Sequence, residues 1–342
     1  MSQKTTIYDI AKELNISAAT VSRALNNNPK ISKNTCKLVM ETAARMNYKQ
    51  NKLALALRSG KSNNVGVIVP RVDSNFFGSI IRGIEEELHP NKYHVIICQT
   101  HENEKREIEN INTLLNAQVD GIMISITNES KENEKIIHRV IEKNIPLIFF
   151  DRKKSIDGVS SVTINDFKAG YIATQHLIDE GCKRIAHLSG DQSLEIYENR
   201  FKGYKQALLD NGIDFDENYV FRTKSNVEAG RQATEKLLKL ENPPDAIFSS
   251  SDFAALGAIQ ELKSQGIKIP EDFCVVGFGN EPFTKFMELS ISSVDQSPME
   301  MGKMTAKVFL EQVNNTENFK MEKKVVLNPE LHIRKSSSRN TL

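Results

Sequence analysis

The chain of 342 residues has no tryptophan, only four cysteines and no long apolar run. Cys36, Cys98, Cys182 and Cys274 lie far apart and form no CxxC pair, so we expect reduced, mostly buried thiols and no disulfide framework. The longest apolar segments, such as 145–150, have the length of a β-strand, whereas a membrane helix needs about 20 residues. The first residues show no apolar core of a secretory signal, which predicts a cytoplasmic protein.

Motifs of common enzyme chemistry are also missing. No G-x-G-x-x-G segment opens a helix, the seven histidines form no HExxH pattern, and no histidine or cysteine cluster has the spacing of a metal site. Residues 60–62 resemble the end of a phosphate-binding loop, but the glycine required five residues earlier is Leu55. No glycine-flanked serine builds a nucleophile elbow. We therefore predict no enzymatic activity, no cofactor and no metal.

Charge is distributed unevenly, although the net charge of the whole chain is only +1. The first 60 residues hold ten lysines and arginines against three acids, a net charge of +7, which leaves −6 for the remaining residues. A small basic segment on a larger acidic body suggests a module that binds a polyanion, joined to a body with another task. A solvated basic surface without a binding role is the alternative, and charge alone does not distinguish between the two interpretations.

Residues 1–48 show helical signals and no strand signal. Apolar residues at 7, 10, 11 and 14 share one helical face after Thr5 or Thr6, either of which can cap that helix. Ser17 can cap a second helix that runs to about residue 26, and Ser32 a third over about 33–46. The segment 51–58 is rich in alanine and leucine but too short to hold a helix alone in water.

The first two predicted helices fit a helix-turn-helix, in which the start of the second helix enters the major groove of DNA. The small side chains of Ala18 and Ala19 allow close approach to DNA. Hydroxyls at 20 and 22 can bind phosphates, and Arg23 can pair bidentately with guanine. A generic three-helix interaction domain fits the same pattern.

From residue 65 the pattern changes to alternating strands and helices. Apolar runs predict strands at 65–69, 93–98, 121–126, 146–150, 159–164, 184–188, 246–249 and 274–278, with amphipathic helices such as 77–88, 105–115, 167–179 and 228–240 between them. Continuous apolar strands separated by helices indicate buried parallel sheets with right-handed crossovers. About 280 residues of this pattern exceed one doubly wound sheet, so we predict two such lobes with a cleft between them, behind an all-α head.

These motifs resemble the LacI/GalR family along essentially the whole chain and in order. In the head, the resemblance is carried by residues 8–11 (YDIA), 16–17 (IS), 20–26 (TVSRALN) and 46–48 (MNY). In the body, it is carried by 65–70 (VGVIVP), 76–77 (FF), 120–122 (DGI), 150–152 (FDR), Gly190, Arg200, 203–204 (GY), 251–252 (SD), 255–257 (ALG) and 276–280 (VGFGN). The head motif is highly specific and favours DNA binding over the generic alternative.

The resemblance implies a homodimeric transcription regulator whose recognition helix, residues 17–26, reads one half of a two-fold operator. By family position, the DNA-binding residues of the head are Thr6, Tyr8, Ser17, Ala18, Ala19, Thr20, Ser22, Arg23 and Asn26. Residues 51–58 match the hinge helix, with Ala54 at the closest approach to DNA and Leu57 as a wedge in the minor groove. Gln50 stands where the family usually has proline, which predicts a more mobile unbound hinge.

Ligands of open α/β sheets bind beyond the carboxyl ends of the strands. The expected effector-binding residues follow predicted strands or are implied by family position: Asp73, Asn75, Phe76, Phe77, Ser125, Thr127, Asp151, Arg152, Arg200, Asp252, Asn280 and Gln296. Carboxylates, guanidinium groups and amides beside aromatic faces suit a polyhydroxylated ligand such as a sugar. Some of these residues have structural alternatives, since Asp151 could cap a turn and Phe77 could belong to the core. Gly279 stands where the family often carries an acid, so the ligand's identity does not transfer.

We predict a helix-turn-helix head at 1–49, a hinge helix and linker at 50–61, and a two-lobed effector-binding and dimerisation core at 62–342. The N-lobe is expected at about 62–162 and 293–321, and the C-lobe at about 163–292 and 322–342. The C-terminus has no leucine heptad for a tetramerising helix, which predicts a dimer.

The predicted function is a DNA-binding regulator, a repressor, gated by an effector between the lobes. A free sugar is the first candidate effector, followed by a phosphorylated sugar, a nucleoside or purine, or a partner protein. An exported solute-binding protein would need a signal and no basic head. An enzyme acting on sugars or nucleotides would need a phosphate loop or an acid–base pair. Neither alternative fits the chain.

Overall fold

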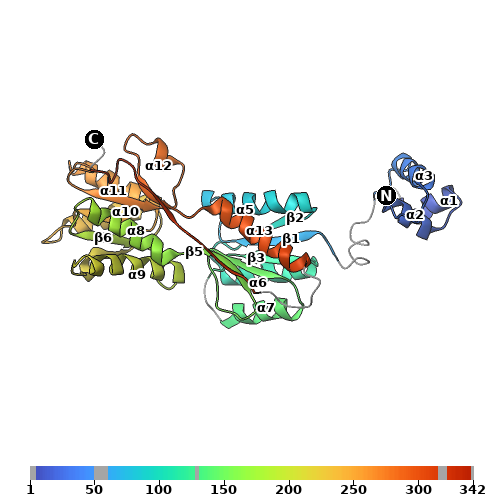
Figure 1. Ribbon diagram of the computed structural model, residues 1–342, viewed down its shortest axis with the longest axis horizontal. Helices are drawn as coiled ribbons and strands as arrows, with labels where there is room; N and C mark the ends of the chain where they lie inside the picture. Colours follow the sequence, from blue (N-terminus) through green and yellow to red (C-terminus); the bar gives the residue numbers. More distant parts are fainter. Residues whose placement is uncertain (1–4, 50–60, 128–130, 315–321, 340–342) are drawn as a thin grey trace. The chain divides into compact units, whose positions relative to one another are not determined.

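The computed structural model describes residues 5–49, 61–127, 131–314 and 322–339, and the chain divides into two units, Met1–Ser62 and Asn63–Leu342 (Figure 1). Each unit has its own apolar core. The expected hinge segment, with Gln50, Ala54 and Leu57, lies outside the described residues.

Three capped helices form the described part of the first unit: α1 (Ile7–Glu13), α2 (Ala18–Leu25) and α3 (Lys33–Arg45). Thr6 caps α1 in a capping box: its hydroxyl accepts from the Asp9 backbone N–H, and the Asp9 carboxylate accepts from the Thr6 N–H at 2.8 Å. Ser17 and Ser32 cap the other two helices, as predicted, each through a hydroxyl that accepts a backbone N–H at 3.1 Å. These caps supply part of the stability that helices of seven to thirteen residues lack on their own.

The core of this unit is small. Ile10, Val21, Ala24 and Val39 are fully buried, and one or two of them come from each helix. The spacing of apolar residues in the sequence therefore predicts both the three helices and the side of each helix that packs in the core.

Two six-stranded sheets organise the second unit. The first has the order β11-β5-β4-β3-β1-β2 and is parallel throughout. Its strands are β1 (Asn64–Val69), β2 (His94–Gln99), β3 (Gly121–Ile124), β4 (Leu147–Phe150), β5 (Ser160–Ile164) and β11 (Lys324–Leu327). The second has the order β12-β10-β9-β8-β6-β7, and only β10 and β12 pair antiparallel. Its strands are β6 (Ile185–Ser189), β7 (Val220–Arg222), β8 (Ala246–Ser249), β9 (Cys274–Phe278), β10 (Ser292–Asp295) and β12 (Glu330–His332).

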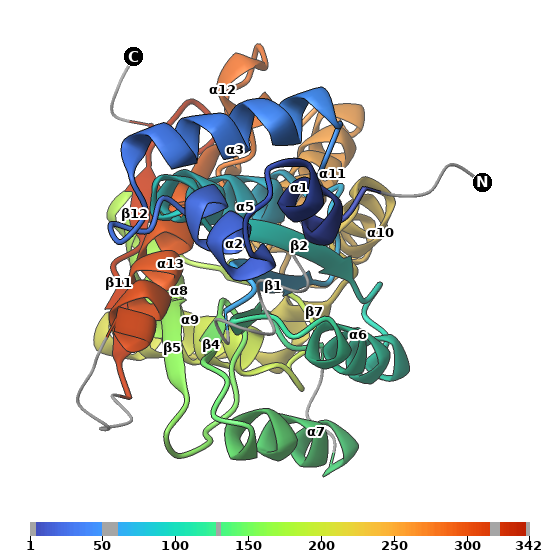
Figure 2. The same cartoon turned by 90° about the vertical axis from the view of Figure 1, so that its right-hand side faces the viewer.

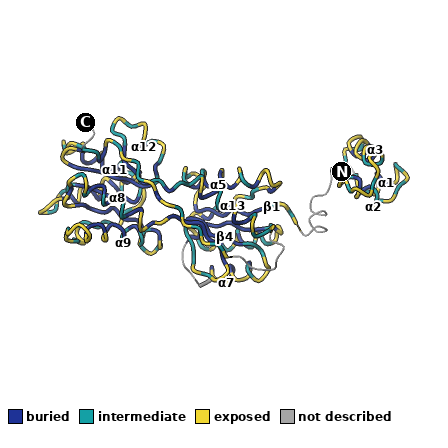
Figure 3. The backbone as a smooth tube through the Cα atoms, in the orientation of Figure 1, coloured by how far each residue is buried: buried dark blue, intermediate teal, exposed yellow. Residues whose placement is uncertain are grey.

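Helices cover both faces of each sheet. Around the first sheet, α5 (Asn75–Leu88) and α13 (Pro298–Asn314) lie on one face, and α6 (Glu104–Asn116) and α7 (Lys131–Glu142) on the other (Figures 1 and 2). The second sheet is flanked by α8 (Asp166–Asp179), α9 (Glu195–Asp210), α10 (Val227–Leu238) and α11 (Asp252–Ser264), with the short helix α12 (Phe283–Phe286) nearby. Short 3₁₀ turns occupy His89–Asn91 and Glu217–Tyr219. The central strands are buried on both faces (Figure 3), which is why they appear in the sequence as continuous apolar runs.

All eight predicted strands and the four named helices of this unit are present, with ends displaced by no more than two residues. The sequence analysis missed β7, β10, β11 and β12, which are short and either polar or at a sheet edge.

Three chain crossings join the two sheets: from β5 into α8, from β10 into α13, and from β11 to β12. Two of the crossings touch, because the Asn165 N–H donates to the Leu327 carbonyl at 3.0 Å. These crossings correct the expected lobe boundaries. β10 belongs to the second sheet and β11 to the first, so the N-lobe segment expected at 293–321 instead begins after β10 and extends to the end of β11.

Reciprocal glycines bring three helix pairs into backbone contact. In the pair α5–α13, a Cβ added at Gly83 would lie 2.3 Å from the Met299 carbonyl oxygen, and one at Gly302 would lie 2.1 Å from that of Ile80. The pairs α8–α9 and α10–α11 repeat the arrangement with Gly170, Gly203, Gly230 and Gly257. Each contact is with backbone, which cannot rotate away as a side chain can.

A buried carboxylate anchors the segment that follows β3. Glu107 on α6 is fully buried and accepts from the Thr127 backbone N–H and the Asn133 side-chain amide, both at 2.8 Å. Burial raises the pKa of Glu107 to about 7, although its bonds to Thr127 oppose the shift. Thr127 was expected to bind the effector, and the structure places it in this cluster; it is not among the residues that line the cavities described below, although its neighbour Ile126 lines the smaller one.

The helix contacts predict opposite effects for two glycines of α5. Gly83→Ala should destabilise the core by about 2–4 kcal/mol, because backbone must move to admit the methyl group. Gly78→Ala is the matched control: nothing lies within 4 Å of its added Cβ, so alanine should stabilise the helix by about 0.5–1 kcal/mol. Urea unfolding of both variants measures the difference, and equal effects would contradict the packing described here.

Glu107 predicts a pH-dependent contribution to stability. Its pKa in the folded chain is raised from 4.5 to about 7, so its protonated form favours folding below pH 4.5 and that contribution disappears as pH rises through 7. The free energy of unfolding of the wild type, relative to Glu107→Gln, should therefore fall by on the order of 3 kcal/mol between pH 4.5 and 7.5. Glu109→Gln, on the exposed side of the same helix, is the control. A difference that does not change with pH would show that Glu107 is not desolvated.

Candidate DNA-binding surface and effector cleft

Helix α2 presents a polar surface free of acids. Six of the nine predicted DNA-binding residues in the head are exposed and three are half-buried; the exposed ones are Thr6, Tyr8, Ser17, Ala19, Arg23 and Asn26. Ala18, Thr20 and Ser22 are half-buried on α2, whose opposite side carries the buried Val21 and Ala24. Tyr8 is 71% exposed, so its ring and hydroxyl are accessible to a partner outside the chain.

The three acids of the head lie on α1 and α3, and each has a partner there. Asp9 closes the capping box, and hydrogen bonds from Thr6 lower the pKa of its carboxyl. Glu13 pairs with Arg45 at 3.0 Å, and Glu41 with Lys37 at 4.0 Å. The α2 surface therefore faces outward with Arg23 and without negative charge.

Two of the expected DNA contacts also hold the helix itself. The Ser17 hydroxyl accepts the Thr20 backbone N–H and lies 2.8 Å from the Thr20 hydroxyl. The Asn26 side-chain amide donates to the Ser22 carbonyl at 2.7 Å, at the C-terminal end of α2. These bonds fix both ends of the helix.

The carboxyl ends of the strands of both sheets border one cavity of about 470 Å³ in the second unit. Eight of the twelve expected effector-binding residues line it: Asp73, Asn75, Phe76, Phe77, Asp151, Arg152, Arg200 and Gln296. The sequence analysis did not assign several further lining residues to the site, among them Glu102, Tyr197, Phe253, Phe278 and Glu281. Glu102 and Phe278 stand at or just beyond the ends of β2 and β9, so strand ends alone would have pointed to them.

Arg200 is the most heavily constrained side chain of the wall. It is 4% exposed, its Nε donates to the Asp166 carboxylate at 2.7 Å, and its Nη2 donates to the Gln296 amide oxygen at 3.3 Å. The guanidinium carbon lies 3.6 Å from the centre of the Phe278 ring. Asp166 follows one crossing and Gln296 lies in another, so Arg200 connects the wall to both. Burial raises the pKa of Asp166 to about 6, even though Arg200 opposes the shift.

Asp151 and Arg152 come directly after β4. Asp151 adopts a φ of 60°, a left-handed conformation that aspartate tolerates better than most residues. Its buried carboxylate accepts from the Ser125 hydroxyl at 3.1 Å, and burial raises its pKa. Arg152 forms a two-point ion pair with Glu102 at 2.7 and 3.2 Å, yet its buried Nε has no hydrogen-bond partner among the described residues.

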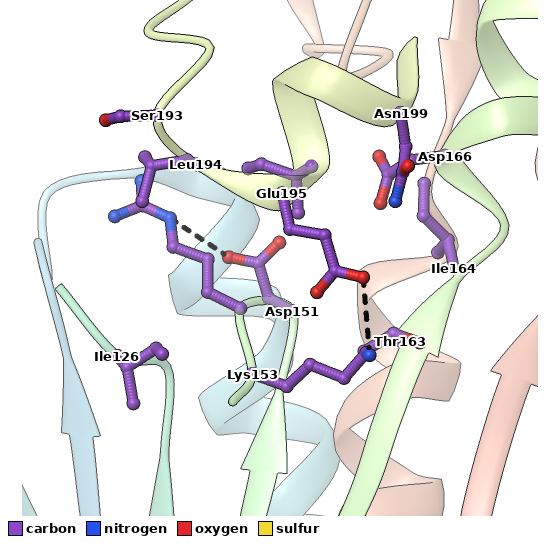
Figure 4. Close-up of a pocket in the computed structure, with 12 residues that line it drawn as sticks. Ile126, Asp151, Lys153, Thr163, Ile164, Asp166, Ser193, Leu194, Glu195 and Asn199 are labelled. Carbon is purple, nitrogen blue, oxygen red and sulfur yellow. Dashed lines mark hydrogen bonds and ion pairs between the residues drawn. The ribbon is translucent and has the colours of Figure 1, made fainter. Parts of the chain in front are cut away.

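A second, smaller cavity of about 50 Å³ adjoins the first and shares Asp151, Arg152 and Ile196 with it. Figure 4 shows Lys153, which follows β4, reaching Glu195 at the start of α9; their ion pair measures 3.4 Å and connects the two lobes. The same view places Asp166 and Asn199 on the wall.

Three other expected residues support the wall from behind. Ser125 donates to Asp151, as described above. Asp252 accepts from the Ser293 hydroxyl at 2.7 Å and from the Glu281 N–H at 2.8 Å, and burial raises its pKa to about 7. Asn280 bonds to Asp295 and accepts from Arg334. Together with Thr127, these residues do not border either cavity, so the structure does not bring them together with the other expected effector-binding residues.

Within the described part of the chain, no group of three or more metal-ligating side chains comes together. None of the helices found there has both the length and the apolar character needed to span a bilayer.

Comparison with known proteins identifies both units. A family model described as bacterial regulatory proteins, lacI family, matches residues 6–51. A second model, described as periplasmic binding proteins and sugar binding domain of LacI family, matches residues 62–333. These matches confirm the fold predicted from the sequence, a helix-turn-helix head followed by a two-lobed α/β core.

Curated relatives cover nearly the whole chain. Catabolite control protein A of Priestia megaterium is 34% identical over 310 residues, which cover 90% of this chain and 92% of the relative. The HTH-type transcriptional regulator DegA of Bacillus subtilis is 33% identical over 335 residues, covering 98% of each.

Solved structures share the fold. The lac repressor dimer bound to operator and an anti-inducer has a TM-score of 0.86 at 21% identity, covering 98% of this chain and 99% of that one. A LacI family regulator from Enterococcus faecium with bound ribose has a TM-score of 0.71 at 27% identity, covering 80% and 98%. The matched families and relatives are transcription regulators and not enzymes, and this chain belongs to the LacI family of bacterial DNA-binding transcription regulators.

Proposed function

We propose that this regulator is a repressor that binds a two-fold operator as a homodimer and is gated by a sugar-like effector in the cavity between its lobes. In this proposal residues 1–49 bind DNA, 50–61 form the hinge and linker, and 62–342 bind the effector and dimerise. Because its target is chromosomal DNA, we expect the protein in the cytoplasm.

The α2 surface supports the DNA-binding part of the proposal. Its N-terminus is capped, its outward side carries hydroxyls, small side chains and Arg23, and the acids of the head lie on other helices. Phosphate contacts position such a helix, whereas base contacts by a few side chains specify the sequence. Arg23 is the residue best suited to a base contact, because a guanidinium pairs bidentately with guanine.

The observation that carries the effector proposal is a pair of buried polar atoms in the cavity wall. Arg152 Nε and the Ser250 hydroxyl oxygen have no hydrogen-bond partner within the described residues, although both residues border the 470 Å³ cavity. Buried polar groups are nearly always satisfied, so these atoms favour a polar ligand. Phe76, Phe77 and Phe278 also line this cavity, and polar groups together with aromatic side chains are the combination that binds a sugar ring.

Arg200 supports a coupling between ligand and lobe arrangement. A ligand that meets Arg200 also bears on Asp166 and Gln296, at two of the three crossings between the lobes. An effector shifts the equilibrium between lobe arrangements only by its difference in affinity for them. In a dimer, that shift alters the spacing of the two heads and therefore their fit to a two-fold operator.

Dimerisation adds affinity that one small head lacks. A second head tethered to the first binds its half-site at high effective concentration. The relative solved on operator is a dimer, which supports the same arrangement here.

Arg23→Ala should remove most of the sequence preference of the head. Loss of one bidentate base contact lowers discrimination by about 1–3 kcal/mol, whereas Lys37→Ala on α3 should leave the ratio of specific to nonspecific affinity unchanged. Fluorescence anisotropy with an operator selected from random duplexes, and with a scrambled duplex, measures that ratio at several salt concentrations. An unchanged ratio for Arg23→Ala would show that another residue reads the bases.

A thermal-unfolding screen tests the effector cavity. A sugar at about 100 times its dissociation constant should add roughly 2.7 kcal/mol of stability, and Asp151→Ala should abolish that shift relative to its own ligand-free midpoint. Thr127→Val is the control, because Thr127 lies in the Glu107 cluster and should leave ligand binding intact. A ligand whose effect survives Asp151→Ala would place the effector outside this cavity.

A further inference from the structure

The arginines of the cavity wall are already paired with carboxylates. The pairs are Arg71 with Asp73, Arg152 with Glu102, and Arg200 with Asp166. The first two are two-point contacts with distances of 2.7–3.2 Å, and the third is a buried contact of 2.7 Å. The charge of each guanidinium is therefore already compensated by a carboxylate, although Arg152 Nε remains open as a donor, and a ligand phosphate could take over the two-point contact of Arg71 or Arg152 only by displacing that carboxylate.

Glu281 is the carboxylate of the wall that lacks such a partner. It is half-buried just beyond the end of β9, and its carboxylate forms no ion pair with a lysine, arginine or histidine of the described chain. In contrast, Asp151 lies 3.8 Å from Arg152 Nε, and Glu195 lies 3.4 Å from Lys153 Nζ. Its backbone N–H donates to Asp252, whereas its side chain remains in the cavity wall. Burial raises the pKa of Glu281, and its charge in turn raises that of Asp252.

The two adjoining cavities carry an excess of negative charge. Six carboxylates and four cations line them, which gives a formal charge of −2: Asp73, Glu102, Asp151, Asp166, Glu195 and Glu281 against Arg71, Arg152, Lys153 and Arg200. This excess lies beside apolar rings and buried side chains, where charge interactions are stronger than in bulk water.

We propose that Glu281 makes the cleft selective for an uncharged or amine-bearing polyhydroxylated ligand and against phosphorylated or carboxylated ones. The inference rests on the proposed effector function of the cavity and specifies its ligand class. Glu281 accepts hydrogen bonds from the ligand, either from neighbouring hydroxyls or from an ammonium group. These two donors are the only groups of a sugar or amino sugar that a carboxylate recognises.

Helix N-termini near the cavity favour anionic ligands, whereas Glu281 disfavours them, so preferential binding of a phosphorylated ligand is the competing outcome. The N-termini of α5, α9 and α11 border the two cavities, and a helix N-terminus attracts anions. Acidic side chains already occupy the first turns of α9 and α11, namely Glu195, Glu198 and Asp252. Only α5 begins without one, and its free N–H groups can bind the oxygens of uncharged hydroxyls as well as those of a phosphate.

Matched ligands and one substitution test the selectivity. Isothermal calorimetry at pH 8 compares glucose, glucosamine and glucose 6-phosphate, and ribose with ribose 5-phosphate, on wild type, Glu281→Gln and Glu288→Gln. Glu288 is exposed near the same segment and outside both cavities, so its variant is the control. In wild type, the phosphate should bind at least tenfold more weakly than its parent sugar. Glu281→Gln should lower the affinity for the uncharged or amine-bearing ligand about tenfold and reduce the ratio of affinities between a sugar and its phosphate. If only the affinity for glucosamine falls, the ammonium group is the donor to Glu281.

The stability of the ligand-free protein tests the proposal even if none of the sugars in the panel binds. An unpaired, half-buried carboxylate that waits for a ligand destabilises the empty cleft, so Glu281→Gln should raise the melting temperature at pH 8 by a few degrees and Glu288→Gln should not. A Glu281→Gln variant that is less stable than wild type, or a phosphate that binds more tightly than its parent sugar, would overturn the proposal. Operator binding, measured by fluorescence anisotropy without effector, does not depend on the charge of the effector. A protein that binds operator but lacks the expected ligand selectivity would overturn only the role of Glu281, whereas loss of operator binding would contradict the proposed function.

Discussion

One buried arginine holds together the segments that connect the two lobes of the core. Arg200 connects a helix of the second lobe to two of the three segments that pass between the lobes, through Asp166 and Gln296. Removing one partner of a buried ion pair leaves the other charge unsolvated, at a cost of about 3–5 kcal/mol. The same guanidinium borders the cavity between the lobes, so one side chain of the cavity wall also holds two of the connecting segments.

Most of the fold could be predicted from the sequence, because its elements obey local rules. Buried parallel strands are continuous apolar runs, and serine or threonine caps mark the beginnings of the helices in the head. The sequence analysis did not predict β10, which is polar, or β11, which lies at the edge of its sheet. Both strands form by pairing with strands that are distant in the sequence, and local sequence patterns do not reveal such pairing. The lobe boundaries were wrong for the same reason, since the chain returns between lobes through these short strands.

The grouping of the expected site residues was predicted in part, and the differences have a common physical cause. Asp151, Arg152 and the aromatic pair after β1 follow strand ends and lie around one cavity, because parallel strands end at one edge. Sequence cannot show on which side of a wall a polar residue lies, so Asp252 and Asn280 were assigned to the cavity although they bond to its back. Glu281 carries no motif, and only the structure shows that it differs from the other acids lining the two cavities, each of which lies beside an arginine or lysine.

The glycine contacts between helices have a mechanical consequence. Helices whose backbones touch at two reciprocal points, such as Gly83 and Gly302, cannot slide past each other without a collision between main-chain atoms. We therefore expect each lobe to move largely as a rigid body, with the change in conformation concentrated in the three connecting segments. A small rotation at those segments would then displace the far end of a lobe by more than it displaces the residues near the connections.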